Sequence, residues 1–135
     1  MQMVIEQIIQ EALSYKGTPY QWGGFSRQGI DCSGLMVKAF QAGGFNIPRV
    51  AGDQAKIGPM VEVDELIPGD LVFFTDHPGN MGITHVGLVS VTNFPTHSIT
   101  FVHASSSKGV MESELLSPYW QGVYLGAVRP SAFLG

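Results

Sequence analysis

Apolar side chains recur with helical spacing near the start of the chain. They stand one or three residues apart and keep one face of residues 2–15 apolar, which predicts an amphipathic helix: Val4, Ile5, Ile8, Ile9, Ala12 and Leu13. Gly17 and Pro19 end this helix. A second helix is predicted over residues 32–42, because Asp31 is a good N-cap and an apolar stripe follows it, consisting of Leu35, Met36, Ala39 and Phe40.

The second half of the chain has the pattern of β-strands. A nearly continuous apolar run over residues 70–75 predicts a central strand. The β-rich runs 85–91 and 97–103 are separated by turn-forming residues and predict an antiparallel hairpin, and residues 123–129 predict a closing strand. No repeat or linker interrupts the pattern, so residues 1–135 are expected to form a single domain.

Composition narrows the class of protein. The chain is 44% hydrophobic and only 13% charged, which excludes intrinsic disorder. Its 17 glycines and 8 prolines favour a loop-rich α+β or β fold over a helical bundle. The net charge is −4 and no run of Lys or Arg exists, so no nucleic-acid partner is expected. No apolar stretch approaches the roughly 20 residues of a membrane helix, so no membrane insertion is expected.

Cys32 is the only cysteine of the chain. It can therefore form neither an internal disulfide nor part of a four-cysteine zinc site. It stands in the first turn of the predicted second helix, where the helix dipole and free backbone amides favour a thiolate. The alternative to a nucleophile is a small buried apolar side chain.

The predicted hairpin brings two histidines together. If its loop is centred on Phe94, Val91 faces His97 and His85 faces His103. Directly opposed residues point to the same face of the sheet with Cβ atoms about 5 Å apart, so the two imidazoles could share a hydrogen bond. A loop with an even number of residues would instead put them on opposite faces.

Cys32, His85 and His103 have the chemical types of a nucleophile, a base and an orienting group. A free thiol with a pKa of about 8.5 is mostly protonated at neutral pH, so a nucleophilic cysteine needs a base. An imidazole can take that proton and return it to a leaving amine, while a third polar group holds the ring in the useful tautomer. The helix and the hairpin are distant in the sequence, so their meeting is a prediction for the structure.

An ordered series of short motifs extends from about residue 7 to residue 130. Each motif alone is weak, but the ordered set resembles the NlpC-type cell-wall cysteine peptidases, compact papain-like enzymes of bacteria; the motifs are Pro19-Tyr-Gln-Trp-Gly-Gly, Asp31-Cys-Ser-Gly, Pro48-Arg49, Asp53-Gln54, Pro68-Gly-Asp-Leu-Val-Phe-Phe, His85-Val-Gly and Val102-His-Ala. The resemblance implies an α+β fold in which N-terminal helices pack on a small central antiparallel sheet of about five to six strands.

The same resemblance implies an activity. It is the hydrolysis of peptidoglycan stem peptides or muropeptides, usually at the amide between γ-D-glutamate and meso-diaminopimelate (or lysine). Carried over by motif, Cys32 is the nucleophile, His85 the general base and His103 the orienting third member.

Three further residues match functional positions of the family. Tyr20 matches a tyrosine whose hydroxyl helps to bind the oxyanion or the substrate, and Asp31 and Ser33 match residues that in some members hold the free amine of an N-terminal L-alanine. No cofactor is expected. Asp76 and His77 could suggest a metal pair, but no third ligand stands at a suitable spacing, so no metal is expected either.

Two other functions stay open on the sequence alone. One is a different amidase or acyltransferase reaction, because papain-like relatives use cysteine and histidine alike. The other is a catalytically silent wall-binding module, against which the complete set of Cys32, His85 and His103 argues. The first residues lack the basic segment of a signal peptide. The expected location is the bacterial cell envelope or the medium if the protein is exported, or the cytoplasm if it recycles peptides.

Overall fold

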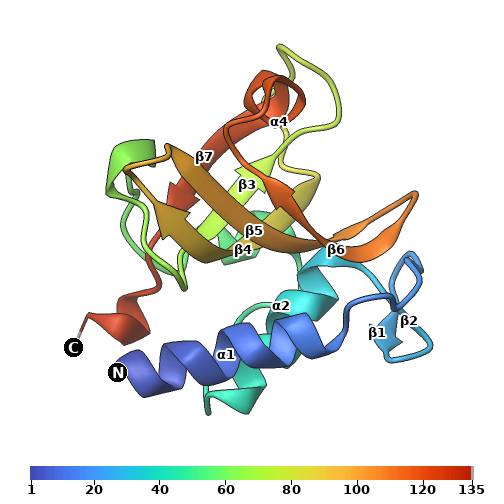
Figure 1. Ribbon diagram of the computed structural model, residues 1–135. Coiled ribbons are helices and arrows are strands. Elements are labelled where there is room, and N and C mark those ends of the chain that lie inside the picture. The colour runs from blue at the N-terminus through green and yellow to red at the C-terminus, as the bar shows by residue number, and fades with distance from the viewer. Residues whose placement is uncertain (135) are drawn as a thin grey trace.

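Two helices cross one face of an antiparallel sheet in the computed structural model, which describes residues 1–134 (Figure 1). Helix α1 spans Gln2–Ser14 and helix α2 spans Cys32–Ala42, as the sequence predicted. Both lie below the sheet in the view of Figure 1. Ile8 of α1 and Leu35 of α2 have no exposed surface and belong to the same apolar core as the near face of the sheet. Burial of these apolar faces is what holds the helices on the sheet.

The sheet has five strands, all antiparallel to their neighbours, in the order β6-β5-β4-β3-β7. They are β3 (Leu71–Phe74), β4 (His85–Asn93), β5 (Ser98–Ser105), β6 (Gly109–Glu114) and β7 (Tyr124–Val128). The predicted α+β fold with a small antiparallel sheet is therefore confirmed. Strand β6 was not predicted from the sequence.

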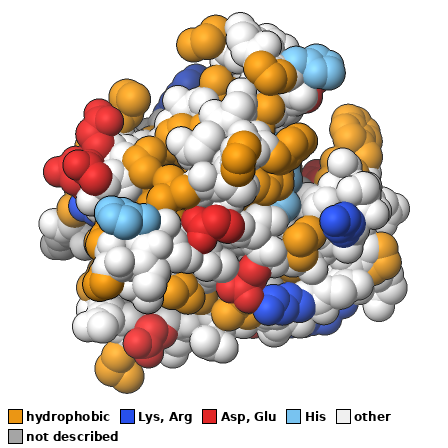
Figure 2. All heavy atoms as spheres, turned by 45° about the horizontal axis from the view of Figure 1, so that its top comes forward, with side chains coloured by type: hydrophobic (Ala, Val, Ile, Leu, Met, Phe, Trp, Pro, Cys, Tyr) orange, Lys and Arg blue, Asp and Glu red, His pale blue; other side chains and the backbone are white. Residues whose placement is uncertain are grey.

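The remaining elements are short. They are the two-stranded ribbon of β1 (Phe25–Ser26) and β2 (Gly29–Ile30), the helices α3 (Ala51–Gln54) and α4 (Pro118–Val123), and the 3₁₀ turns Val63–Glu65 and Ser131–Phe133. Among residues 1–134 no helix is long and apolar enough to cross a membrane. On the face in Figure 2, acidic and basic side chains lie in small separate groups and form no continuous charged patch.

Both faces of the sheet are apolar, and the strand period sorts their side chains. Phe73, Val86 and Val102 point toward α1 and α2. Phe74 and Phe101 point to the opposite face, where Trp120 of α4 covers them. A buried strand residue that is polar therefore stands out on either face, and His103, with no exposed surface, is such a residue.

The predicted register of the β4–β5 hairpin is wrong, but His85 and His103 still lie on the same face of the sheet. Asn93 pairs with Ser98, so four residues form the loop, and this even number was expected to put the histidines on opposite faces. The register then shifts between Val89 and Val91, where a β-bulge adds one residue to β4. The bulge restores the parity, so His85 and His103 share a face as diagonal neighbours instead of facing each other directly.

Candidate active site

The start of helix α2 meets the first residues of strand β4, and Cys32 stands at this junction. The residue is 8% exposed, and Sγ lies 4.0 Å from the backbone oxygen of Thr84, to which it donates. The backbone amides of Val86 and Ser33 lower the pKa of the thiol and so favour its charged form. The predicted meeting of the helix with the hairpin is thus present, because both Thr84 and Val86 are neighbours of His85 in the sequence.

Two hydrogen bonds connect three side chains of adjacent strands, His85, His103 and Ser113. His85 Nε2 lies 2.8 Å from His103 Nδ1, and His103 Nε2 lies 2.8 Å from Ser113 Oγ on β6. His85 Nε2 is therefore occupied, which leaves Nδ1 as the nitrogen of His85 that can serve the thiol. With Nδ1 unprotonated, Nε2–H of His85 donates to His103, whose own Nε2–H donates to Ser113.

Trp120 of α4 fixes the two rings from the side. Its ring stacks on His85 at a centroid distance of 5.7 Å and an angle of 19°, and it meets His103 edge-on at 4.9 Å. Such aromatic packing restricts the imidazoles to few orientations. The order of the site therefore depends on α4 as well as on the sheet.

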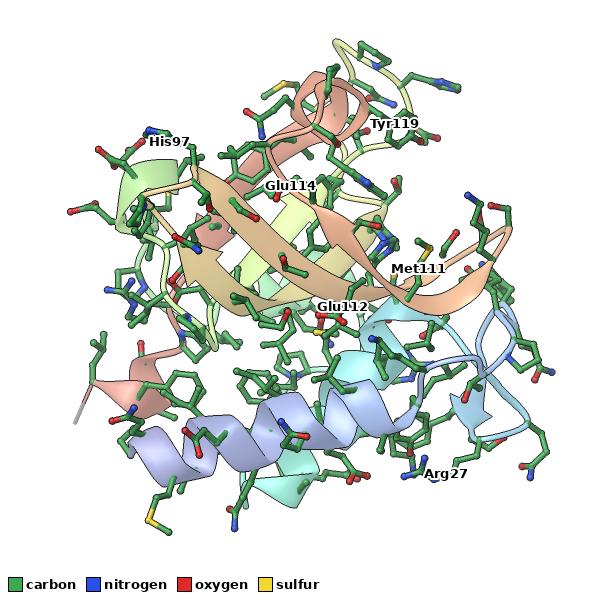
Figure 3. All side chains as sticks on the ribbon, viewed as in Figure 1. Arg27, His97, Met111, Glu112, Glu114 and Tyr119 are labelled. Carbon is green, nitrogen blue, oxygen red and sulfur yellow. The ribbon has the colours of Figure 1, made fainter. Side chains whose placement is uncertain are left out.

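A cavity of about 530 Å³ opens over these residues, and Tyr20, Cys32, His85 and His103 all line it. Tyr119 borders it from α4 and Met111 from β6, and Figure 3 shows these two on the same side of the sheet. A volume of this size suits a short peptide segment. Among residues 1–134, no group of three or more His, Cys, Asp or Glu side chains is placed to hold a metal ion.

Burial determines the charge of the central residues. It raises the pKa of Cys32, and the backbone hydrogen bonds from Val86 and Ser33 only partly offset this. The amides at the helix start favour a thiolate, as expected, but desolvation opposes it more strongly. Burial also lowers the pKa of His85 to about 4 and, together with the charge of His85, that of His103 to about 3. The resting site at neutral pH holds a thiol and two uncharged imidazoles.

Tyr20 and Cys32 line the same cavity. Burial raises the pKa of the Tyr20 hydroxyl, and a negative charge on Cys32 raises it further. The hydroxyl therefore stays protonated and able to donate a hydrogen bond while negative charge develops beside it. Its position at the cavity agrees with the predicted role in binding an oxyanion.

Asp31 and Ser33 flank Cys32 in the sequence but do not line the cavity. Asp31 caps α2, as predicted, by accepting a hydrogen bond from the amide of Gly34 at 2.7 Å. Both carboxylate oxygens also bind Arg49, at 3.0 and 3.1 Å, and Arg49 reaches Ser33 Oγ at 2.8 Å. These three residues form one polar cluster on the other side of the helix start.

Sequence reasoning missed two of the residues that build the site, Ser113 and Trp120. A serine in an edge strand and a tryptophan in a short helix carry no motif of their own. Ser113 could have been found only by predicting strand β6 and its register. His103 pairs with Met111, and Ser113 stands two residues further along the same face. His77 is exposed, and His97 lies in the loop at the far end of the hairpin (Figure 3); neither lines the cavity.

A thiol at a helix start, an imidazole on the adjoining sheet, a second imidazole behind it and a neighbouring hydroxyl together define a papain-like cysteine hydrolase. Comparison with known proteins identifies the family within this class. The profile of the NlpC/P60 family matches residues 17–129. The chain belongs to the NlpC/P60 family, which confirms the resemblance found in the sequence motifs.

Individual relatives agree with this assignment. The chain is 44% identical over 127 residues to the probable endopeptidase NlpC of Escherichia coli K12, covering 93% of this chain and 78% of that protein. It is 52% identical over 83 residues to the gamma-D-glutamyl-L-lysine dipeptidyl-peptidase of Bacillus subtilis, covering 62% of this chain and 28% of that protein.

A crystal structure of an NlpC/P60 family protein from Bacillus cereus superposes on the chain with a TM-score of 0.82 at 29% identity, over 93% of this chain and 40% of that one. The chain thus spans less than half of the Bacillus cereus and Bacillus subtilis proteins.

Proposed function

We propose that this chain is a cysteine endopeptidase that hydrolyses peptidoglycan stem peptides at the amide between γ-D-glutamate and the diamino acid that follows it. The observation that carries the proposal is the cavity that Cys32, His85 and Tyr20 line together. The relatives support the substrate, since one is named for cleavage after γ-D-glutamate and another as an endopeptidase. We further propose that residues 1–135 act as one catalytic domain on material of the bacterial cell envelope.

The first step is acylation of the sulfur. As Cys32 Sγ attacks the γ-D-glutamyl carbonyl carbon, its proton passes to Nδ1 of His85, which becomes an imidazolium. The carbonyl oxygen gains negative charge and accepts hydrogen bonds from the Tyr20 hydroxyl and the Cys32 backbone amide. Because the resting thiol and imidazole are both neutral, His85 works as a general base during the attack.

Collapse of the tetrahedral intermediate breaks the C–N bond. The imidazolium of His85 gives its proton to the leaving amine, and the γ-glutamyl group stays on the sulfur as a thioester. A water molecule then gives one proton to His85 and attacks the thioester, and the sulfur leaves and is reprotonated. The enzyme returns to its resting state with one amide bond hydrolysed.

His103 acts through His85. By accepting the Nε2–H of His85 it holds the tautomer whose Nδ1 is free for the thiol, and it orients the positive charge that forms on the ring. Ser113 in turn holds the tautomer of His103. We propose that the polar cluster of Asp31, Ser33 and Arg49 borders the far end of the acyl fragment, where a free L-alanine amine would be held by Asp31 and Ser33.

Digestion of defined stem peptides tests the proposed bond. With L-Ala-γ-D-Glu-meso-diaminopimelate as substrate, mass spectrometry is expected to show L-Ala-D-Glu and free diaminopimelate. Intact sacculi digested in parallel should release fragments cut at the same amide. Cleavage at the L-alanine amide, at a bond between sugar and peptide, or transfer to an added amine in place of water would contradict the proposal. Binding to sacculi without any cleavage would indicate a wall-binding module.

A further inference from the structure

One loop at the rim of the cavity carries a charge that the mechanism does not use. Residues 106–108 form the turn between β5 and β6. These three residues, Ser106, Ser107 and Lys108, line the cavity of Cys32 and His85 together with Ser105, the last residue of β5. Lys108 is exposed. In Figure 1 this turn is the tip that projects to the right from β5 and β6.

The ammonium of Lys108 is available for a ligand. Among residues 1–134 it forms no ion pair. The other basic side chains are engaged: Lys16, Arg27, Arg49, Lys56 and Arg129 pair with carboxylates, and Lys38 lies over the ring of Phe25. In a protein with a net charge of −4, a free cation beside a catalytic thiol attracts an anionic part of the substrate.

The loop that carries Lys108 is held in place by hydrogen bonds within the loop and by contacts with Thr18. Ser105 Oγ accepts hydrogen bonds from the backbone amides of Lys108 at 3.2 Å and Ser107 at 3.4 Å. Gly109 has φ +77° and packs so closely on the carbonyl of Thr18 that a Cβ would collide with it. The amide of Val110 donates to Thr18 O at 3.0 Å, which ties the hairpin to the segment before Tyr20. Such preorganisation lowers the entropy lost on binding.

In the proposed reaction the leaving fragment must reach His85, which lines the cavity. The leaving amine receives its proton from His85, so the residue that carries this amine occupies the side of the thiol on which the imidazole stands. His85, His103 and Lys108 line one and the same cavity. The cluster of Asp31, Ser33 and Arg49 lies outside it. In the proposed reaction the leaving residue is the diamino acid.

The charges of the lining fit one of the two diamino acids better. Asp76 is its only carboxylate and Lys108 its only ammonium, and they come from different loops. The free end of meso-diaminopimelate carries both an ammonium and a carboxylate, whereas that of lysine carries an ammonium alone. Building on the proposed function, we propose that Lys108, assisted by the hydroxyls of Ser106 and Ser107, binds the side-chain carboxylate of the diamino acid and selects meso-diaminopimelate over lysine.

The test compares kcat/KM on three tripeptides, L-Ala-γ-D-Glu followed by meso-diaminopimelate, by its side-chain amide, or by L-lysine. The wild type is expected to favour the free meso-diaminopimelate peptide about tenfold over the other two, which corresponds to one charge-assisted hydrogen bond. Lys108→Met should remove this preference by lowering only the first rate, and Lys108→Arg should restore most of it. Lys56→Met is the matched control, since Lys56 is exposed and does not line the cavity.

The outcomes separate the inference from the proposed function. If the wild type cleaves all three peptides equally, or if Lys108→Met slows all three to the same extent, the inference is overturned and the proposed function stands. If the wild type cleaves none of them, both are overturned. A loss confined to the free meso-diaminopimelate peptide, absent from the Lys56 control, supports the inference.

Discussion

Burial sets the resting protonation of the side chains at the centre of the site. The thiol of Cys32 is harder to ionise than a free thiol, and His85 and His103 are harder to protonate than free imidazoles, because each loses water on folding. In the proposed mechanism the proton therefore moves from sulfur to nitrogen during the attack and does not rest on His85 beforehand. The same mechanism gives each histidine a distinct task, transfer for His85 and orientation for His103.

Substitution of the two histidines tests these tasks. His85→Gln should lower kcat by about 10²- to 10⁴-fold, the usual worth of a general base. His103→Gln should cost clearly less, because glutamine can still accept the Nε2–H of His85. Both effects are measured as release of the diamino acid from the tripeptide, with circular dichroism to check the fold. Equal losses from the two variants would argue against separate roles.

Among the secondary-structure elements, one β-bulge in β4 determines whether His85 and His103 lie on the same face of the sheet. The sequence predicted the hairpin and its two histidines, but it gave no means to locate the bulge in β4, because Val89-Ser-Val91 reads as an ordinary strand. The face of the sheet on which each histidine lies depends on the length of the loop and on the bulge together. The helix that carries Cys32 was predictable from its cap and its apolar stripe. Its contact with β4 was not, because tertiary packing has no signature in the spacing of residues.

Strand β6 was missed for a related reason. Residues 109–114 read Gly-Val-Met-Glu-Ser-Glu, without the alternation of a half-buried strand. The strand lies at the edge of the sheet, where its polar side chains bond inward: Glu114 accepts from the amide of Ile99, and Ser113 meets His103. The position of Ser113 beside His103 follows only from the register between β5 and β6.

A prediction about Ser113 tests the contribution of this edge strand. Ser113→Ala should lower kcat several-fold and change KM less, because loss of the hydrogen bond to His103 frees the tautomer of that ring. Ser113→Thr keeps the hydroxyl and should restore most of the rate. A change in KM alone, or no rescue by threonine, would show that Ser113 acts in another way.

At the scale of the whole molecule, the buried imidazoles couple the stability of the fold to pH. The folded protein keeps His85 and His103 neutral down to pKa values of about 4 and about 3, whereas the unfolded chain protonates them near 6.5. The unfolded state binds more protons in that interval, so stability falls as pH drops. Stability from this source is complete above pH 6.5 and is lost progressively as the pH falls toward about 3.

Urea unfolding at pH 7 and pH 5 measures this coupling. Each neutral histidine is expected to contribute about 2 kcal/mol to the drop in the free energy of unfolding over that interval. His103→Gln should therefore lose about 2 kcal/mol less than the wild type between the two pH values, whatever its stability at pH 7. Carboxylates titrate in both proteins alike and cancel in the comparison. Identical pH dependences would contradict a buried neutral His103.

The central claim is that the sulfur of Cys32 is the nucleophile of an amide hydrolase. The most direct measurement is the turnover of L-Ala-γ-D-Glu-meso-diaminopimelate by Cys32→Ala beside the wild type, with the folded state of both confirmed by circular dichroism and thermal unfolding. Turnover by the wild type and none by the variant are expected, and the small side chain of alanine at the start of α2 preserves the fold. Cleavage of the tripeptide by a folded Cys32→Ala protein would contradict the central claim.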